Sequence, residues 1–391
     1  MTSFDAPAHG FPSSEFEGRV ARAQEIMRRY EFDALLLTTS HNIRYFSGFD
    51  SQFWESPTRP WFVVVPAEGK PMAVIPEIGA PEMERTWIDD VRSWPAPQPA
   101  DDGTSLLTAA LAQLPRRFGR VGAELGREMS LRMPVMQFLE LRDKLPGLEL
   151  DNGSPCIWEV RRVKTEGEIA RIRFICGIAS QAYENLPNLV SQGDSVRDAC
   201  RRLTIDILNR GADAVPFLPG IAGFDGPNQI VCGPQDKDLE EGDILFIDTG
   251  STYDGYFCDF DRNYAVGKVS DEARRANAAV WDATEAGLAV ARPGATVEDV
   301  WRAQSEVIEA AGSLGNNVGR MGHGLGLQLT EPPSNMPGDI TMLEPGVVLT
   351  IEPGMEFAPG HMIVHEENVL ITEDGCELLT LRAPRDFWTI D

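Results

Sequence analysis

An acidic β-hairpin predicted in the second half of the chain constrains the fold more than any other feature. Ile244–Ile247 is an apolar, β-prone run that ends at Asp248, and Asp254-Gly255 is a strong signal for a two-residue hairpin loop. With that loop, Asp248 lies opposite Asp261 and diagonal to Asp259 on the returning strand. Residues two apart in a strand share a face, so all three carboxylates should point the same way.

Three carboxylates on one buried face repel one another and lose their hydration unless a cation lies among them. A hard divalent metal ion is the simplest cation that fits. On this stretch alone, an acidic hairpin exposed to solvent is the alternative.

The size and charge of the chain limit the other possibilities. Its 391 residues are many for one core and predict two domains. A net charge of −25 disfavours binding to nucleic acid and to anionic membrane surfaces. Six scattered cysteines without a CxxC pair indicate a reducing compartment, and no apolar run approaches the roughly 18 residues of a membrane span. We therefore expect a cytoplasmic protein.

Helices alternate with short apolar strands over the first 155 residues, which predicts an α/β domain. Ser14–Glu17 has the capping-box pattern and should open a helix that ends near Tyr30. The turn-rich segment Asp151–Pro155 should end this domain. The other predicted helices are Ser105–Leu114 and Pro134–Lys144, and the predicted strands are Asp33–Thr38, Trp61–Val65, Met72–Ile75 and Arg120–Glu124.

Residues 156–391 predict an α+β domain. Thr165–Glu168 is a second capping box, and the helix that it opens carries apolar residues on one face. Besides the hairpin, helices are predicted over Ser195–Asn209, Asp271–Ala291 and Val297–Ala311, and strands over Gln229–Cys232, Val348–Ile351 and Val364–Ile371.

Three later segments carry side chains that could join the carboxylates of the hairpin. His323 stands between glycines, where the backbone can approach a site closely. Glu352 ends the apolar run Leu349–Ile351, and Glu366 precedes the apolar run Val369–Ile371. Taken singly, each of these residues would be an ordinary structural group.

The order of these motifs resembles the creatinase/aminopeptidase P/prolidase family, the "pita-bread" metallohydrolases. The matching elements are the pair Asp248 and Asp259, the GHGLG and IEPG motifs, and a glutamate before the run VLITEDG. Residues 19–49 resemble the family's N-terminal domain, and residues 163–169 resemble the start of its catalytic domain. The resemblance implies an α/β N-terminal domain over residues 1–155 and an α+β pita-bread catalytic domain over residues 156–391.

The resemblance also implies a site for two divalent metal ions, with manganese expected first and iron, cobalt or zinc as alternatives. Asp248 would chelate one ion, and Asp259 and Glu366 would bridge both. His323 and Glu352 would complete the second. A hydroxide held by the metals would attack the substrate carbonyl, and Glu352, His323 and Glu366 would be the catalytic residues.

This chain departs from the family around the metals, where the family's peptidases usually carry more histidines. The segment Ile230–Gln235 lacks one of them, Gly319 replaces a second and Thr330 replaces a third. Val364 replaces an arginine. Asp261 stands where the family usually has a threonine, so it could contact a metal directly or support a ligand.

Without those imidazoles, proton transfer would fall to other groups near the site. The candidates, which could also contact the substrate, are Thr330, His361 and His365, with Glu331 beside them. Glu367 follows the implied ligand directly and should face away from it, because neighbouring residues of a strand alternate.

Proteins that resemble this one commonly form homodimers, in which a loop of the smaller domain reaches the partner's active site. By that analogy, Arg59 could bind a substrate carboxylate and Trp61 could close the pocket. Phe217 could line the pocket, although core packing explains it equally well.

Together these features predict a metal-dependent hydrolase that cleaves a carbon–nitrogen bond in an Xaa-Pro peptide or another small amide. Its partner would be a small molecule or a short peptide. The alternatives are an ectoine-type amide hydrolase, a dimethylsulfoniopropionate-type lyase, and a binding module in which metals only stabilise the fold. Metal content and product analysis separate these possibilities.

Overall fold

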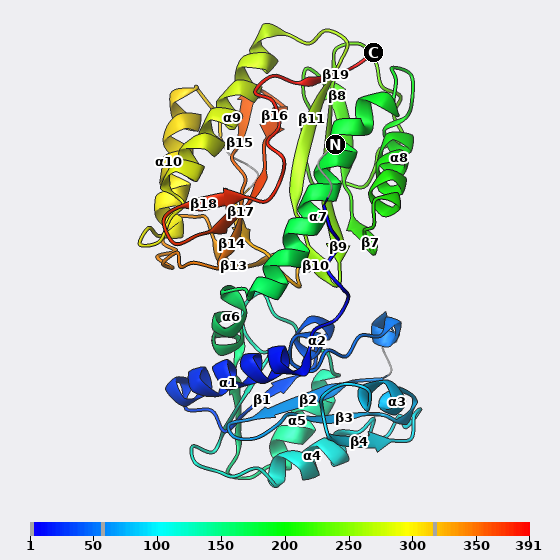
Figure 1. Cartoon of the computed structure of the whole chain (residues 1–391), viewed down its shortest axis with the longest axis vertical. Helices are drawn as coiled ribbons and strands as arrows, with labels where there is room; N and C mark the ends of the chain where they lie inside the picture. The colour runs from blue at the N-terminus through cyan, green and yellow to red at the C-terminus, as the bar shows by residue number, and fades with distance from the viewer. Residues whose placement is uncertain (1–3, 56–58, 316–318) are drawn as a thin grey trace. The chain divides into compact units, whose positions relative to one another are not determined.

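A mixed six-stranded sheet organises the first part of the chain, in the order β4-β3-β2-β1-β5-β6. The computed structural model describes residues 4–55, 59–315 and 319–391 (Figure 1). The strands are β1 (Ala34–Leu37), β2 (Phe62–Pro66), β3 (Met72–Pro76), β4 (Asp90–Trp94), β5 (Arg120–Ala123) and β6 (Glu149–Asn152). The helices are α1 (Ser13–Tyr30), α2 (Ser40–Ser47), α3 (Ala80–Met83), α4 (Thr104–Ala112), α5 (Val135–Asp143) and α6 (Ser154–Arg162), with 3-10 turns η1 (Gln52–Glu55) and η2 (Glu77–Gly79).

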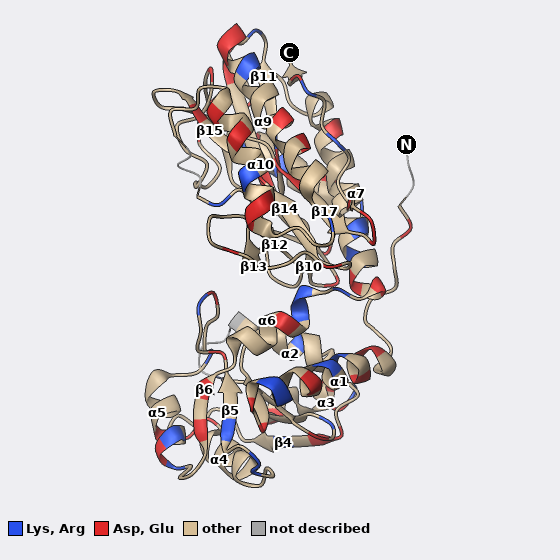
Figure 2. Cartoon of the chain, turned by 90° about the vertical axis from the view of Figure 1, so that its left-hand side faces the viewer, with Lys and Arg blue, Asp and Glu red and all other residues tan. Residues whose placement is uncertain are grey.

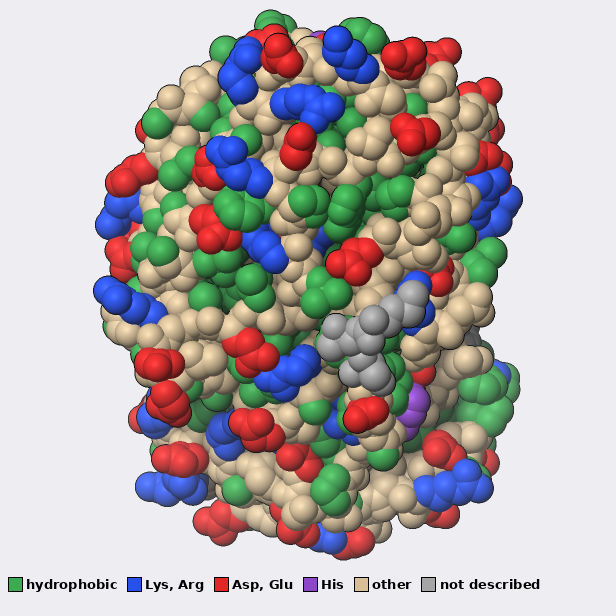
Figure 3. Space-filling view, turned by 45° about the horizontal axis from the view of Figure 1, so that its top comes forward, with side chains coloured by type: hydrophobic (Ala, Val, Ile, Leu, Met, Phe, Trp, Pro, Cys, Tyr) green, Lys and Arg blue, Asp and Glu red, His purple; other side chains and the backbone are tan. Residues whose placement is uncertain are grey.

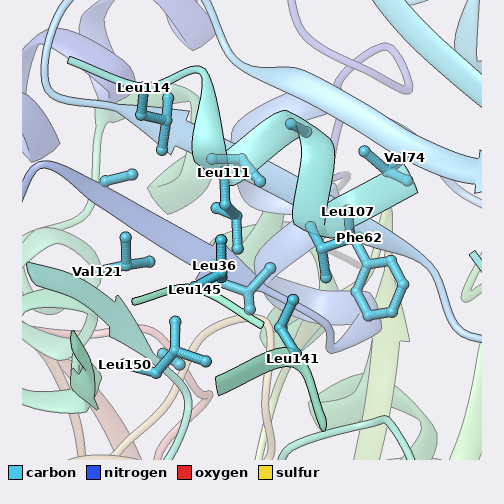
Figure 4. Packing of buried hydrophobic residues seen from close by; sticks show 14 of the residues in the cluster. Leu36, Phe62, Val74, Leu107, Leu111, Leu114, Val121, Leu141, Leu145 and Leu150 are labelled. Atoms are coloured by element: carbon cyan, nitrogen blue, oxygen red, sulfur yellow. The ribbon is translucent and has the colours of Figure 1, made fainter. Parts of the chain in front are cut away.

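Apolar side chains of this sheet and of α4 and α5 form a core of their own, which Figure 4 shows at close range. Leu36 and Phe62 on neighbouring strands meet Leu107 and Leu111 of α4 and Leu141 of α5, and all five are fully buried. Burying such a side chain stabilises a fold by about 1.5–3 kcal/mol. Residues 9–161 therefore form a unit with its own source of stability.

Within the described chain, the second unit contains residues 4–8, 162–315 and 319–391. Two larger sheets, β10-β9-β11-β19 and β13-β12-β14-β17-β18, build it, and β7 and β8 also pair with β9. Its strands are β7 (Ala214–Phe217), β8 (Gly220–Phe224), β9 (Asp243–Tyr253), β10 (Tyr256–Phe257), β11 (Phe260–Val266), β12 (His323–Gly324), β13 (Glu331–Ser334), β14 (Val348–Ile351), β15 (Gly354–Ala358), β16 (His361–Val364), β17 (Glu367–Ile371), β18 (Cys376–Leu378) and β19 (Trp388–Ile390).

Two pairs of helices flank these strands, as Figure 1 shows. The helices are α7 (Glu166–Asn185), α8 (Val196–Asn209), α9 (Asp271–Val290) and α10 (Val297–Ala310), with the 3-10 turn η3 (Leu186–Asn188). Helix α7 packs on β9, where the Tyr183 hydroxyl donates to the Ile247 carbonyl at 3.1 Å. Helix α9 packs on β15 and β16, where its Val280 joins Met355 and Ile363 in one apolar cluster. The strands that carry the acidic residues are thus held between helices.

The predicted α/β and α+β classes are confirmed, and every predicted helix is present within a few residues of its expected bounds. Two local predictions were wrong. Ser14 does not cap α1, because that helix already begins at Ser13 after Pro12, without a side-chain cap. Residues 229–232 form no strand.

The predicted strand Val364–Ile371 is in fact two strands, β16 and β17, separated at His365 and Glu366. The predicted domain boundary between residues 155 and 156 lies near the start of α6, whereas the chain passes from one compact unit to the other between residues 161 and 162, at the end of that helix.

The ribbon in Figure 2, coloured by residue type, shows acidic residues on helices of both units, with basic residues dispersed among them. On the face drawn in Figure 3, hydrophobic side chains lie scattered between residues of both charges. Of the helices in the described chain, none combines the length and the apolar character that a membrane span requires. The six cysteines, all of them described, form no disulfide.

Candidate metal centre

The acidic hairpin adopts the predicted register. Tyr253 pairs with Tyr256 across the Asp254-Gly255 loop, and both loop residues have positive φ, +47° and +78°, as a type I′ turn requires. Further along the hairpin, Asp248 on β9 lies directly opposite Asp261 on β11. Opposed residues of paired strands present their side chains on the same face, so these two carboxylates share one side of the sheet.

Side chains of helix α7 bind the turn of this hairpin. The Arg171 guanidinium donates to the Asp254 carboxylate at 2.5 Å, and both side chains are buried. The Tyr256 hydroxyl donates to Glu168 at 3.0 Å, and Glu168 also closes the capping box of Thr165 at the start of the helix. The helix cap and the hairpin turn therefore support one another.

Three buried side chains from distant parts of the sequence converge beside the hairpin. Asp259 lies between β10 and β11, His323 begins β12, and Glu366 lies between β16 and β17. One ligand atom of each lies within 4.8 Å of those of the other two, and His323 Nε2 is 3.4 Å from Asp259 Oδ2. Such a group of two carboxylates and an imidazole can hold a divalent cation.

Asp248 and Glu352 flank this group and are less deeply buried than its members. Their negative charges raise the pKa of Asp259, after the larger effect of its burial. Burial also raises the pKa of Asp248 to about 7, against the opposing effect of the Thr249 amide. Glu352 and Glu366 have pKa values raised well above the ordinary range, by burial first and then by neighbouring carboxylates. A cation among these groups would relieve their repulsion.

Unpaired polar atoms support the presence of a cation at this place. Asp248 Oδ1 and Glu366 Oε1 are buried and have no hydrogen-bond partner among the described residues. Buried carboxylate oxygens are normally paired or bound to a metal. The donor set of four carboxylates and one imidazole therefore fits the divalent ions that the resemblance implies.

The imidazole of His323 is oriented for a metal. Its Nδ1 lies 2.9 Å from the Gly324 carbonyl, so Nδ1 carries the proton and Nε2 presents a lone pair towards Asp259. Burial lowers its pKa to about 4, and the nearby Arg320 adds to this effect. The ring is therefore neutral at physiological pH, as a ligand must be.

The glycines around His323 are required by close packing. A Cβ on Gly322 would lie 2.2 Å from the Thr350 carbonyl oxygen, and its φ of +123° favours glycine as well. A Cβ on Gly324 would lie 2.6 Å from the Pro332 carbonyl. Only glycine allows β12 to approach β13 and β14 this closely, which explains the predicted GHG motif.

A hydrogen-bond network fixes the backbone that carries Glu366. Arg262, which follows Asp261, donates to the Glu366 carbonyl at 2.7 Å and to the Glu367 carboxylate at 2.9 Å. Burial would raise the pKa of Glu367, but Arg262, His365 and Arg382 together hold it well below its ordinary range. Glu367 thus belongs to a buried ion network, separate from the carboxylate group around Asp259.

The predicted proton carriers lie in different surroundings. His365 Nε2 contacts Arg382 and lies 3.3 Å from the Glu367 carboxylate, and burial lowers its pKa to about 4. His361 begins β16 and precedes Val364 by three residues, so the two residues lie about 10 Å apart along the strand. Glu331 forms a buried ion pair with Lys164 at 3.3 Å. Thr330 is half-buried, directly before β13.

Phe217 lies over the face of the sheet that carries Asp248. It pairs with Gly250, and a Cβ on Gly250 would lie 3.1 Å from Phe217 and 2.3 Å from Leu329. Gly250 and Asp248 share a face because they are two residues apart on β9. Phe217 is 37% exposed, so it is available to a ligand on that face.

Sequence reasoning missed Leu329 and Arg320 near this site. Leu329 comes from a loop whose position no local pattern reveals. Arg320 donates to Ser334 at 2.9 Å, and its charge lowers the pKa of Asp259 and Glu352, so it lies within electrostatic reach of both. A basic residue two positions before the GHG motif was the available signal.

The surroundings of Trp61 favour a structural role, and its predicted substrate contact stays a prediction. Trp61 is only 1% exposed and packs between Phe49 and Trp54, with ring centroids 5.3 Å and 5.6 Å away. It is a core residue of the first unit. Arg59 is half-buried in the same unit and stays a prediction.

Two of the departures from the family pattern meet in one apolar cluster. Val364, which replaces the arginine, packs with Ile221 and Phe246, and Ile230 and Cys232 pack against them. The segment that lacks the histidine and the strand that lacks the arginine are therefore joined by hydrophobic contacts.

Comparisons with known proteins agree with this geometry. Residues 170–373 match the model of metallopeptidase family M24, and residues 19–163 match the creatinase/prolidase N-terminal domain. A probable dipeptidase PepE from Mycobacterium tuberculosis is 28% identical over 378 residues, covering 93% of this chain and 94% of that protein. An Xaa-Pro dipeptidase from Pyrococcus horikoshii is 26% identical over 367 residues, covering 93% and 96%.

The fold is shared with solved structures. A prolidase from Thermococcus sibiricus superimposes with a TM-score of 0.85 at 25% identity, covering 96% of this chain and 99% of that one. This confirms the expected pita-bread architecture behind a creatinase-type N-terminal domain. The family match spans more than half of the sequence and includes all five implied ligand positions. The chain therefore belongs to metallopeptidase family M24 and is a metallohydrolase that resembles the Xaa-Pro peptidases.

Proposed function

We propose that this protein cleaves Xaa-Pro dipeptides or short peptides with the help of two divalent metal ions. The observation that carries the proposal is the convergence of Asp259, His323 and Glu366 within 4.8 Å, with Asp248 and Glu352 beside them. The names of the relatives, dipeptidase and Xaa-Pro dipeptidase, support a peptide substrate.

In this proposal the five residues named above hold the ions. When bound, the ions would polarise the scissile carbonyl and activate a water molecule. His323 offers Nε2 in its neutral form, because Nδ1 is engaged with the Gly324 carbonyl. Glu352 is only partly buried, and its carboxylate would take up a proton released at the site and pass it to the leaving amine.

Phe217 and Leu329 would supply the apolar wall against which a proline ring packs. The Thr330 hydroxyl is next to Leu329 and would donate to a substrate carbonyl or carboxylate. Arg59, His361 and His365 stay predicted substrate contacts, and the contacts of His365 with Arg382 and Glu367 favour a structural role for it.

Manganese is the proposed metal, because carboxylates outnumber the imidazole in the donor set. A homodimer and a cytoplasmic location belong to the same proposal. The six free cysteines support a reducing compartment.

The experiment pairs elemental analysis with a substrate panel, using the full chain purified without a histidine tag. We expect about two metals per chain, and turnover of Gly-Pro, Ala-Pro and Xaa-Pro-Xaa peptides after manganese is added. Asp259→Asn and His323→Ala should lose metal and turnover, since each removes a ligand. Asp282→Asn is the control, because that carboxylate pairs with Arg385 on the exposed side of α9.

Full activity in either ligand variant would contradict the proposal. Bound metal without peptide turnover would redirect the search to small amides or to a lyase substrate, which product analysis separates. A wild-type chain that binds no metal would refute the metal centre altogether.

A further inference from the structure

Asp261 is a buried acid whose carboxylate forms no ion pair with the described residues. The residue is 1% exposed, and neither of its Oδ atoms forms a hydrogen bond of ordinary geometry with the described residues. The Glu366 backbone amide and the charge of Arg262 lower its pKa, but burial and Asp248 raise that pKa by more. The neighbouring Arg262 does not neutralise it by contact, because its Nη donors go to the Asp261, Glu366 and Leu381 carbonyls and to the Glu367 carboxylate.

The backbone directs this carboxylate into the metal centre. Asp261 pairs directly with Asp248 across β9 and β11, which places both side chains on one face of the sheet. Its charge also contributes to the raised pKa of Asp259, Glu352 and Glu366, so it is electrostatically close to all three. The centre therefore contains a fifth carboxylate, that of Asp261, in addition to the four carboxylates and one imidazole of the implied ligands.

An unpaired buried carboxylate is costly to a fold. Donors or a cation must offset that cost when the residue is charged. The Glu366 amide and the charge of Arg262 do so only in part, because the pKa of Asp261 stays well above its ordinary range. A cation bound by Asp248 would lie on the face of the sheet that also carries the Asp261 carboxylate.

We propose that Asp261 is a direct ligand of the ion held by Asp248, and so adds a sixth side chain to the metal centre. This inference rests on the proposed metal centre. It makes the donors around that ion all carboxylate, from Asp248, Asp259, Asp261 and Glu366, while His323 serves the other ion. Carboxylate-rich sites suit hard ions such as Mn²⁺, whereas imidazole suits Zn²⁺ better. The two positions should therefore differ in metal preference.

The test compares the wild type with Asp261→Asn, which keeps the shape of the side chain and removes its charge, and with Asp261→Thr as a second variant. Manganese is titrated into metal-free protein by calorimetry. Electron paramagnetic resonance then reports whether the bound Mn²⁺ ions are spin-coupled. Thermal melting of the metal-free proteins is recorded in parallel.

We expect two opposite effects in the variants. Affinity for one of the two Mn²⁺ ions should fall by about tenfold or more, and the spectrum at limiting metal should change from coupled to mononuclear. The metal-free variant should melt higher than the metal-free wild type, because a buried negative charge has been removed. Asp254→Asn is the matched control: it is a buried carboxylate on the same hairpin, but it is paired with Arg171, so it should lower the melting temperature and leave manganese affinity unchanged.

Wild-type affinity for both ions in Asp261→Asn and Asp261→Thr would overturn the inference. A lower melting temperature of the metal-free variants with unchanged affinity would also overturn it, because that pattern indicates a structural role. A wild-type chain that binds two ions and cleaves no peptide refutes the peptidase proposal alone, since the affinity comparison still decides the role of Asp261. A wild-type chain that binds no ion refutes both.

Discussion

Asp248 illustrates how protons and metal compete for one residue. Its pKa is raised to about 7 by burial, well above the ordinary value near 3.9. In the metal-free protein, Asp248 therefore binds a proton at pH values where the unfolded chain has lost it. The protonated Asp248 therefore contributes fully to the stability of the metal-free fold below about pH 4. This contribution is lost as the pH rises through about 7. Metal binding has the opposite pH dependence, because the ligand must be deprotonated.

We therefore predict that manganese affinity falls as the pH is lowered from 8 to 6, by up to about tenfold per pH unit below the pKa for one displaced proton. Calorimetry at constant ionic strength measures the dissociation constant at each pH. Repeating the titration in buffers of different ionisation enthalpy counts the protons released. A constant affinity with no proton release would show that Asp248 is already ionised at pH 6.

At the scale of elements, the start of α7 shows which local signals determine structure. Thr165 accepts the Glu168 amide at 3.3 Å, and the Glu168 carboxylate accepts the Thr165 amide at 2.9 Å, so the predicted capping box is complete. Ser14–Glu17 has the same spacing, yet α1 begins one residue earlier, behind Pro12. The pattern identifies a helix start only approximately.

These two helix starts give a paired prediction. Thr165→Ala should lower the free energy of unfolding by about 1 kcal/mol, since it removes the side-chain acceptor for an amide of the first turn. Ser14→Ala should change stability little, because Ser14 is exposed inside the first turn and caps nothing. Urea unfolding followed by circular dichroism measures both. Equal losses in the two variants would mean that Ser14 has a role in the helix after all.

How much the sequence predicts depends on whether the signal is local. The Asp-Gly loop determined the pairing of Asp248 with Asp261, because turn type sets register over the whole hairpin. The break between β16 and β17 was missed, because His365 and Glu366 interrupt an apolar run without any turn residue. Arg320 and Leu329 were missed because their positions depend on tertiary packing.

At the scale of the whole molecule, the chain consists of two units with separate cores. The candidate ligands Asp248, Asp259, His323, Glu352 and Glu366 all belong to the second unit. Its stability should therefore depend on metal, whereas that of residues 9–161 should not.

Differential scanning calorimetry with and without a chelator tests this division. At a metal concentration 100-fold above the dissociation constant, we expect about 2.7 kcal/mol of added stability in the second unit, or roughly 5–10 °C for a unit of this size. The transition of the first unit should not move. A single transition that shifts as a whole would indicate that the two units unfold together.

The ligand set spans a long stretch of chain, and this has a consequence for biosynthesis. The ribosome makes Asp248 and Asp259 well before His323, and it makes Glu366 last, just ahead of β17. A nascent chain therefore presents an incomplete, weak chelator until β17 has emerged and paired with β14. This unit therefore folds before it binds metal. The selectivity of the folded site then decides which ion is bound, and the weak affinity of the unfolded acidic segment does not.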